Sequence, residues 1–131
     1  METRKPIVYI VDDDKDLRTS LAWLLESVSV QAQCFAGAEE FLSQYDPKQP
    51  ACLVLDVRMP ETSGFQLQEI LNQRGSTLPT IFVSAHGDIP MSVTAMKNGA
   101  LDFVEKPYNP QQMIDRIQAA LKVAVHAQAD Q

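Results

Sequence analysis

The sequence predicts an α/β fold in which five parallel strands form one sheet covered by helices on both faces. Five short apolar runs, rich in β-branched residues, alternate along the chain with stretches of helical period. Three of these runs are almost entirely apolar, as expected of parallel strands that are covered on both faces. The 131 residues suit one domain with one continuous core. The commonest arrangement at this size is the flavodoxin-like (βα)5 three-layer sandwich with strand order 2-1-3-4-5.

The predicted strands share short length and branched apolar side chains. They are residues 7–11, 30–35, 52–55, 81–83 and 101–104. The second run mixes apolar with polar residues, so we expect it to be the least buried. Cys34 and Cys52 lie inside these runs and are too few for a disulfide framework, so we expect both to be reduced core residues.

The predicted helices each present an apolar stripe to the sheet. The residues expected on these stripes are Leu17, Leu21, Leu24, Leu25, Val28, Phe41, Leu42, Leu67, Ile70, Leu71, Met113, Ile114, Ile117, Ala120, Leu121 and Ala124. The fourth helix should begin near Pro90 and end at Asn98-Gly99, a common pair at helix ends. Trp23 lies at the margin of the first stripe, where we expect partial packing, and Met91 and Met96 should fill helix faces.

The domain is expected to span residues 1–125, with residues 126–131 forming a frayed tail or the start of a linker to an output domain that is absent from this sequence. No apolar run reaches the roughly 18–20 residues that span a bilayer, and the first residues lack a signal-peptide cleavage site. The net charge of −6 disfavours nucleic acid and anionic lipid as partners of this fragment. A cytoplasmic protein is therefore expected.

Polar side chains follow the ends of four predicted strands. They are Asp12, Asp13 and Asp14 after the first strand, Asp56 after the third, Ser84 after the fourth and Lys106 after the fifth. In a parallel α/β sheet, ligands bind beyond the carboxyl ends of the strands, near the point where the strand order reverses. We therefore expect these side chains to converge on one crevice.

Three carboxylates in that crevice would repel one another and destabilise the fold unless a cation joined them. Asp12, Asp13 and Asp56 offer hard oxygen ligands, and no cysteine and histidine set competes with them. These ligands suit Mg²⁺ or Mn²⁺ with several bound waters. The alternative is that the first acids merely cap the following helix, a role that suits Asp14 best.

A carboxylate can also act as a nucleophile toward a phosphoryl group and form an aspartyl phosphate. Catalysis of such transfers consists mostly of positioning and charge stabilisation. The cation, Lys106 and the Ser84 hydroxyl could each take one phosphoryl oxygen.

Five separated motifs share the order and the placement of those in one known family. They are Val11-Asp12-Asp13, residues 55–60, Ser63-Gly64, Ser84-Ala85 and Lys106-Pro107. Together they make the chain, over almost its whole length, similar to the receiver domains of two-component response regulators. Residues 86–91 and 95–100 resemble the FixJ-like branch of that family most.

The resemblance implies a role for each site residue. It makes Asp56 the phosphoacceptor, Asp13 a direct metal ligand and Asp12 a ligand acting largely through water. It makes the backbone carbonyl of Arg58 a further metal ligand and Lys106 the phosphate-binding lysine.

The resemblance also implies that Ser84 carries the conserved hydroxyl, that Phe103 is the aromatic switch residue and that the Lys106-Pro107 peptide bond is cis. Two of these residues depart from common forms of the family. Phe103 has no hydroxyl, so its switching would change buried apolar area alone, and Ser84 lacks the methyl group of threonine. The long side chain of Arg58 overhangs the acceptor and could change how water reaches the acyl phosphate.

The function implied is a phosphorylation-dependent switch that receives a phosphoryl group from a sensor histidine kinase. Phosphorylation would change the face formed by the fourth helix and fifth strand and so control homodimerisation or output. The chain would promote only its own magnesium-dependent phosphorylation and dephosphorylation. The resemblance favours the N-terminal regulatory part of a DNA-binding transcriptional regulator; the alternative is a single-domain receiver that docks to a partner protein.

Two other classes fit less well. A haloacid-dehalogenase-type phosphatase could use Asp12 as nucleophile and Asp14 as second acid, but it needs a small residue at Asp16 and leaves Asp56 without a role. A flavodoxin would need hydroxyls in the first loop, which holds three acids instead. His86 has no second histidine nearby and is interpreted as a loop residue, not as a ligand.

Overall fold

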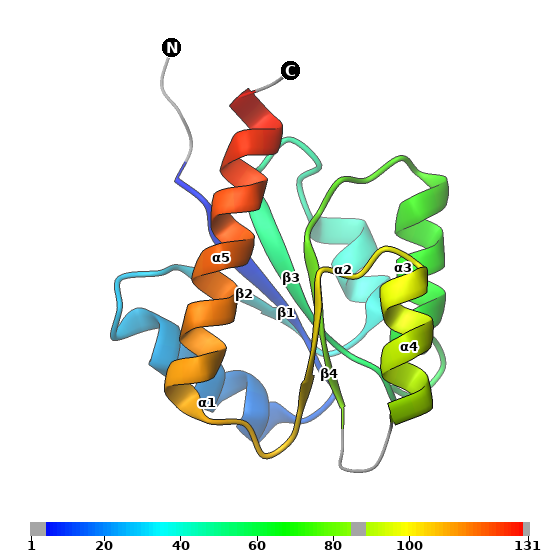
Figure 1. The fold of residues 1–131 in the computed structure, drawn as a ribbon, viewed down its shortest axis with the longest axis horizontal. Coiled ribbons are helices and arrows are strands. Elements are labelled where there is room, and N and C mark those ends of the chain that lie inside the picture. The colour runs from blue at the N-terminus through cyan, green and yellow to red at the C-terminus, as the bar shows by residue number, and fades with distance from the viewer. Residues whose placement is uncertain (1–4, 85–88, 130–131) are drawn as a thin grey trace.

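The computed structural model describes residues 5–84 and 89–129, in which strands and helices alternate along the chain. Their bounds are β1 (Ile7–Val11), α1 (Lys15–Glu26), β2 (Ala32–Phe35), α2 (Ala38–Gln44), β3 (Ala51–Asp56), α3 (Gly64–Gln73), β4 (Thr80–Ser84), α4 (Ile89–Lys97), β5 (Asp102–Glu105) and α5 (Pro110–Ala129). The strands form one parallel sheet of order β2-β1-β3-β4-β5 (Figure 1). The predicted fold class and strand order are confirmed.

Helices cover both faces of this sheet, and each face has its own core. Helices α1 and α5 pack on one face over Val8 and Ile10 of β1, whereas α2, α3 and α4 pack on the other over Tyr9 and Val11 (Figure 1). Successive residues of a strand point to opposite faces, which explains this division. The apolar runs predicted for the central strands therefore contribute side chains to both cores, and all six residues of β3 are buried.

The edge strands differ from their predicted bounds. The second strand begins at Ala32, two residues later than predicted, because the backbone N–H of Val30 donates to Leu25 O and closes the end of α1. The fifth strand is shifted by one residue to Asp102–Glu105. Leu101 precedes it and is 40% exposed, so its apolar side chain does not belong to the strand core as predicted.

The first and last helices also depart from prediction. Trp23 is 69% exposed, so the prediction that it packs partly against the first apolar stripe is wrong. Trp23 and the buried Leu25 lie two positions apart, and residues at that spacing do not share a helix face. Helix α5 continues through His126 to Ala129, where the sequence led us to expect fraying, and the alanines and glutamine there favour helix.

The expectations about the end of the fourth helix and about Cys52 are met, whereas Cys34 is less buried than expected. Gly99 follows α4 with φ +99°, the left-handed conformation that favours glycine at this position. Cys52 is buried, and burial raises the pKa of its thiol to about 12, so it is an inert core residue. Cys34 is a free thiol that is only partly buried. No helix in the described ranges is long and apolar enough to cross a membrane.

Candidate functional site

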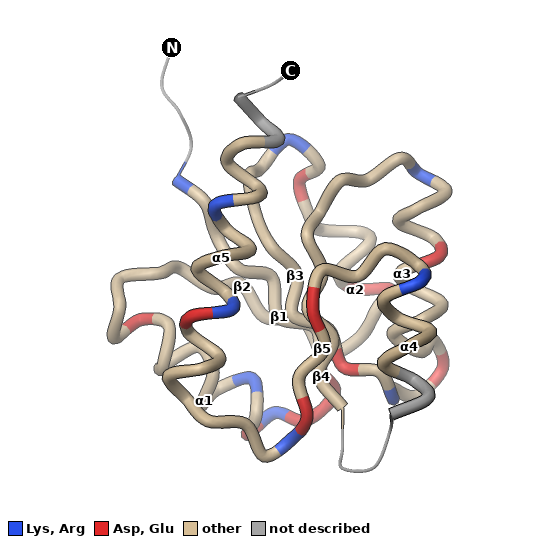
Figure 2. Tube along the Cα trace, viewed as in Figure 1, with Lys and Arg blue, Asp and Glu red and all other residues tan. Residues whose placement is uncertain are grey.

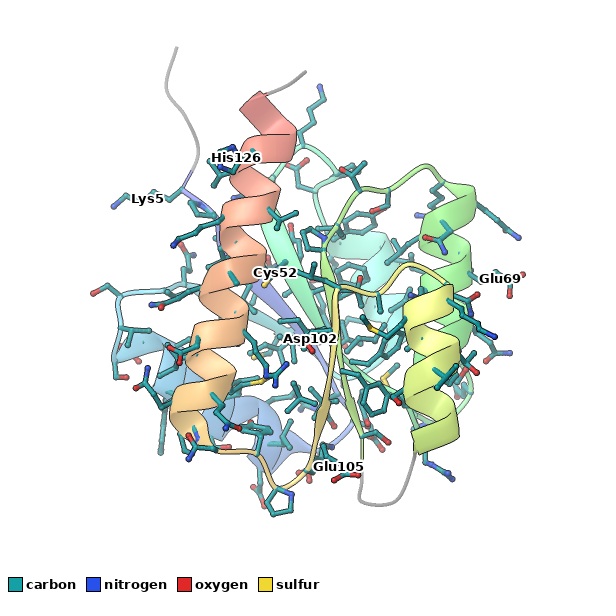
Figure 3. The ribbon with its side chains drawn as sticks, viewed as in Figure 1. Lys5, Cys52, Glu69, Asp102, Glu105 and His126 are labelled. Carbon is teal, nitrogen blue, oxygen red and sulfur yellow. The ribbon has the colours of Figure 1, made fainter. Side chains whose placement is uncertain are left out.

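The carboxyl ends of the central strands meet at one edge of the sheet, as predicted. Asp56 is the last residue of β3 and Ser84 the last of β4, and Asp12 directly follows β1. In the sheet register Asp56 lies beside Val83, and Ser84 beside Glu105. Figure 3 shows Glu105 at this edge, and Figure 2 shows that acidic and basic segments lie close together there.

Asp12 is the most firmly held side chain of the group and is only 2% exposed. Its Oδ1 accepts the backbone N–H of Asp14 at 2.9 Å, and its Oδ2 accepts the ammonium of Lys106 at 3.2 Å. The guanidinium of Arg18 donates to the backbone carbonyl of Asp12 at 2.7 Å. Asp12 thus fixes both the start of the loop after β1 and the direction of Lys106.

Asp56 is 7% exposed and lies close to the same lysine, with Lys106 Nζ 3.8 Å from its Oδ1. Burial first, and then the charge of Asp12, raise the pKa of Asp56 to about 7. Lys106 and a backbone hydrogen bond from Arg58 act in the opposite direction, and a side-chain hydrogen bond with Asp13 raises the pKa further. The ammonium of Lys106 therefore does not cancel the rise in the pKa of Asp56 that burial and the neighbouring acids cause.

The three predicted metal ligands come together. Carboxylate oxygens of Asp12, Asp13 and Asp56 all lie within 4.8 Å of one another. Asp12 and Asp56 are buried, whereas Asp13 is exposed and leaves the cluster open to solvent. Hard oxygen donors around an excess of negative charge fit a hard divalent cation.

Asp14 does not belong to this cluster. Its side chain caps α1 by accepting the backbone N–H groups of Asp16 and Leu17, at 3.0 and 3.3 Å. The capping role that the sequence analysis considered for the first acids is therefore confirmed for Asp14, while Asp12 and Asp13 face Asp56.

The other predicted residues surround the cluster. Ser84 is buried at 1% exposure, and its backbone carbonyl accepts the N–H of Lys106 at 2.7 Å. The Lys106-Pro107 peptide bond is cis, as expected. Arg58 is exposed in the loop after β3. Phe103 pairs with Phe82 in the sheet register and packs, partly buried, against the core beneath α4.

Two site residues were missed by sequence reasoning. Arg18 holds the carbonyl of Asp12 from one turn into α1, and no motif in the sequence singles it out. Gly64 was named only as part of the Ser63-Gly64 motif, without a role, yet a Cβ at this position would lie 2.3 Å from the carbonyl oxygen of Asp56. Its place in the Ser63-Gly64 motif was the available signal. The His86 interpretation falls on residues 85–88, outside the described residues.

Residues 8–118 match the family model of the response regulator receiver domain. The chain therefore belongs to the receiver domains of two-component response regulators, and its relatives place it in the FixJ-like branch. It is 44% identical over 124 residues to the response regulator protein TodT of Pseudomonas putida, covering 95% of this chain and 55% of that protein. It is 40% identical over 123 residues to the transcriptional regulatory protein FixJ of Rhizobium meliloti, covering 94% of this chain and 60% of that one.

Solved structures agree with these relatives. The response regulator StyR superposes with a TM-score of 0.91 at 43% identity, covering 96% of this chain and 64% of that chain. The structure titled FixJ-N gives a TM-score of 0.82 at 38% identity, covering 93% of this chain and 96% of that chain. The chain spans little more than half the length of the curated relatives named above.

Proposed function

We propose that this chain is a phosphorylation-dependent switch that accepts a phosphoryl group on Asp56 from a sensor histidine kinase. The observation that carries the proposal is the placement of Asp56. Its carboxyl group is buried at a strand end, 3.8 Å from the ammonium of Lys106 and within reach of two further carboxylates. In the reaction, a carboxylate oxygen of Asp56 attacks phosphorus while the bond from phosphorus to the donor's leaving group breaks.

The residues around Asp56 suit this transfer. Lys106 is already directed at the acceptor by Asp12, so its charge can stabilise the phosphoryl oxygens with little rearrangement. Ser84 ends the neighbouring strand and would donate its hydroxyl to another phosphoryl oxygen. Asp12, Asp13 and Asp56, with the Arg58 backbone carbonyl, would hold Mg²⁺ or Mn²⁺, which neutralises phosphoryl charge when bound.

We further propose that the chain promotes only its own phosphorylation and dephosphorylation, and that the receiver occupies residues 1–125. The family match to residues 8–118 supports this extent. Two relatives, TdiR of Thauera aromatica and FixJ of Rhizobium meliloti, are transcriptional regulatory proteins. This chain would accordingly be the N-terminal regulatory part of a transcriptional regulator.

The output would be a change of the face formed by α4 and β5. Phe103 packs only partly against the core that contains Ala95 of α4 and Phe82 of β4. Movement of the Ser84 hydroxyl toward a phosphoryl group would vacate space behind β4, which Phe103 could fill by turning inward. The repacked face would then mediate homodimerisation, as a shift between two populated states.

Intact-mass spectrometry with acetyl phosphate and Mg²⁺ tests the acceptor. The wild type should gain one phosphoryl group, and Asp56→Asn should gain none because it keeps the size of the side chain and loses the nucleophile. Asp14→Asn is the matched control, since asparagine still caps α1 and the acid lies outside the cluster. A full phosphoryl adduct on Asp56→Asn would overturn the assignment.

A further inference from the structure

Gln68, in the middle of α3, is buried at 4% exposure although it is polar. Its side-chain Nε2 donates to the backbone carbonyl of Ala95 in α4, but the distance of 3.5 Å is at the limit for a hydrogen bond. Among the described residues, its Oε1 has no hydrogen-bond partner. Reversing the amide would bring its oxygen against the Ala95 carbonyl, so neither orientation satisfies both ends of the group.

An unpartnered buried oxygen destabilises the arrangement that contains it, because the group has lost its hydrogen bonds to water. Gln68 Oε1 has almost no surface exposed to solvent. Most buried polar atoms are satisfied, and an exception calls for a reason. Gln68 is the one buried side chain in the described part of the chain with such an atom.

Two side chains of α3 contact backbone carbonyls near the carboxyl end of α4, and the two contacts differ in length. One turn after Gln68, the side chain of Asn72 donates to the carbonyl of Asn98 at 3.1 Å, just past the end of α4. Helices α3 and α4 lie side by side on this face of the sheet, and the neighbouring Glu69 points away from it (Figures 1 and 3). The hydrogen bond from Asn72 to Asn98 is thus well formed, whereas the hydrogen bond from Gln68 to Ala95, one turn earlier, is weak.

Space is also left unfilled between α3 and the segment that follows α4. A cleft of about 280 Å³ borders Gln68 and Asn72 on one side and Ala100 and Leu101 on the other, with no charged residue in its lining. Close packing normally fixes the position of a segment, and this cleft leaves room for the residues that follow α4 to be displaced.

Ala95 connects this contact to the switch. It is fully buried in the core cluster that includes Phe82 and Ala100, against which Phe103 packs. An inward turn of Phe103 would therefore press on the segment whose carbonyl Gln68 contacts.

We propose that Gln68 is a positioning residue whose unpartnered oxygen disfavours the present position of α4 and gains a hydrogen bond in the phosphorylated position. The inference rests on the proposed function, because it assumes that a phosphoryl group on Asp56 shifts α4. Part of the free energy that favours the phosphorylated state would then come from the new hydrogen bond to Gln68 Oε1 of α3.

The test compares wild type with Gln68→Met, which keeps length and helix propensity but removes the carboxamide. Without ligand, Gln68→Met should melt at a higher temperature than wild type, since the defect is gone. In a titration with beryllofluoride and Mg²⁺, a phosphoryl mimic, its affinity should be weaker by about fivefold or more, the factor that one satisfied buried acceptor supplies. Gln73→Met makes the same change at an exposed position of α3 and should match wild type in both measurements.

A merely structural role would change the melting temperature and leave the affinity for the mimic unaltered. Equal affinity in wild type and Gln68→Met therefore overturns the inference, as does a lower melting temperature of the unliganded variant or its failure to fold. If wild type itself does not bind the mimic, the proposed function fails and this inference fails with it. If wild type binds and only the Gln68 comparison fails, the proposed function stands.

Discussion

At the scale of single residues, Asp56 combines two properties that oppose each other. In the proposed reaction the Asp56 carboxyl group must be ionised to act as nucleophile, yet burial and the charge of Asp12 raise its pKa to about 7. A divalent cation bound to the cluster would resolve the conflict, because it would favour the carboxylate over the carboxylic acid. The charge of Lys106 alone is not sufficient, since the pKa stays high with its ammonium 3.8 Å away.

The raised pKa predicts how stability depends on pH in metal-free protein. Unfolded Asp56 ionises near pH 3.8 and folded Asp56 near 7. Between these values the folded state holds a proton that the unfolded state has lost, so the free energy of unfolding falls as pH rises from about 4 to about 7 and then levels off. Thermal melts from pH 5 to 8 should show this decline in wild type and a shallower one in Asp56→Asn. Parallel curves would contradict the assignment of the shift to Asp56.

Gly64, the first residue of α3, lies where there is no room for a larger side chain. Alanine normally favours a helix over glycine by about 1 kcal/mol. Here a Cβ would lie 2.3 Å from the Asp56 carbonyl oxygen and 3.1 Å from the ring of Phe82. We predict that Gly64→Ala lowers the free energy of unfolding by about 1–3 kcal/mol, the usual range for overpacking. Urea denaturation measures this.

The control for Gly64→Ala is Glu69→Ala, which adds an alanine to the same helix at an exposed position. Its unfolding free energy should stay within about 0.5 kcal/mol of wild type. If Gly64→Ala is neutral or stabilising, the close approach to Asp56 does not limit this position.

At the scale of elements, the sequence predicted the structure well where a hydrophobic pattern repeats along the chain. It predicted poorly where a single hydrogen bond or contact determines the end of an element. The alternation of apolar runs and helical periods predicted the ten elements of the described residues, and the commonest arrangement for a domain of this size supplied their order in the sheet. Asp12, Asp13 and Asp56 were predicted to meet because strand ends of a parallel sheet share one edge. The ends of β2 and β5 were misplaced by one or two residues, since loop hydrogen bonds set them and apolar pattern does not.

Features that depend on contacts between distant elements escaped prediction. Three such features depend on how the chain is folded: the hydrogen bond from Arg18 to Asp12, the lack of space for a Cβ at Gly64 and the unpartnered oxygen of Gln68. Trp23 was misjudged for a related reason. Its position beside an apolar stripe says little about exposure, because large apolar side chains are common on protein surfaces.

The elements β4 and β5 should separate phosphorylation from output. Ser84→Ala should still accept a phosphoryl group, because Asp56 and Lys106 are intact, but should dimerise poorly. Phe103→Ala removes the ring that would turn inward and should behave likewise. Sedimentation velocity with and without beryllofluoride measures dimerisation. If the mimic drives wild type and both variants into dimers equally, a relay from Ser84 to Phe103 does not operate.

At the scale of the whole molecule, the net charge of −6 includes a cluster of three carboxylates at the functional edge. Mg²⁺ should stabilise the folded state by mass action, because the ligands are brought together only by folding. The gain is about 2.7 kcal/mol when Mg²⁺ reaches 100 times its dissociation constant. Thermal melts with increasing Mg²⁺ should show it.

Asp13→Asn should lose most of the stabilisation by Mg²⁺, since it removes one carboxylate ligand. Asp13 is exposed and does not cap α1, so the substitution should leave the fold intact. Asp16→Asn removes the same charge from the exposed first turn of α1 and should retain the stabilisation. Two results would contradict binding of the cation to this cluster. One is a wild-type melting temperature that does not change with Mg²⁺, and the other is an equal loss of Mg²⁺ stabilisation in Asp13→Asn and Asp16→Asn.

The most direct test of the switch is to locate the phosphoryl group chemically. Borohydride reduces an aspartyl phosphate to homoserine, and peptide sequencing by mass spectrometry then identifies the modified residue. After reaction of the wild-type chain with acetyl phosphate and Mg²⁺, homoserine is expected at Asp56. Homoserine at Asp12 or Asp13, or an acid-stable phosphate on a serine, would contradict the proposed function.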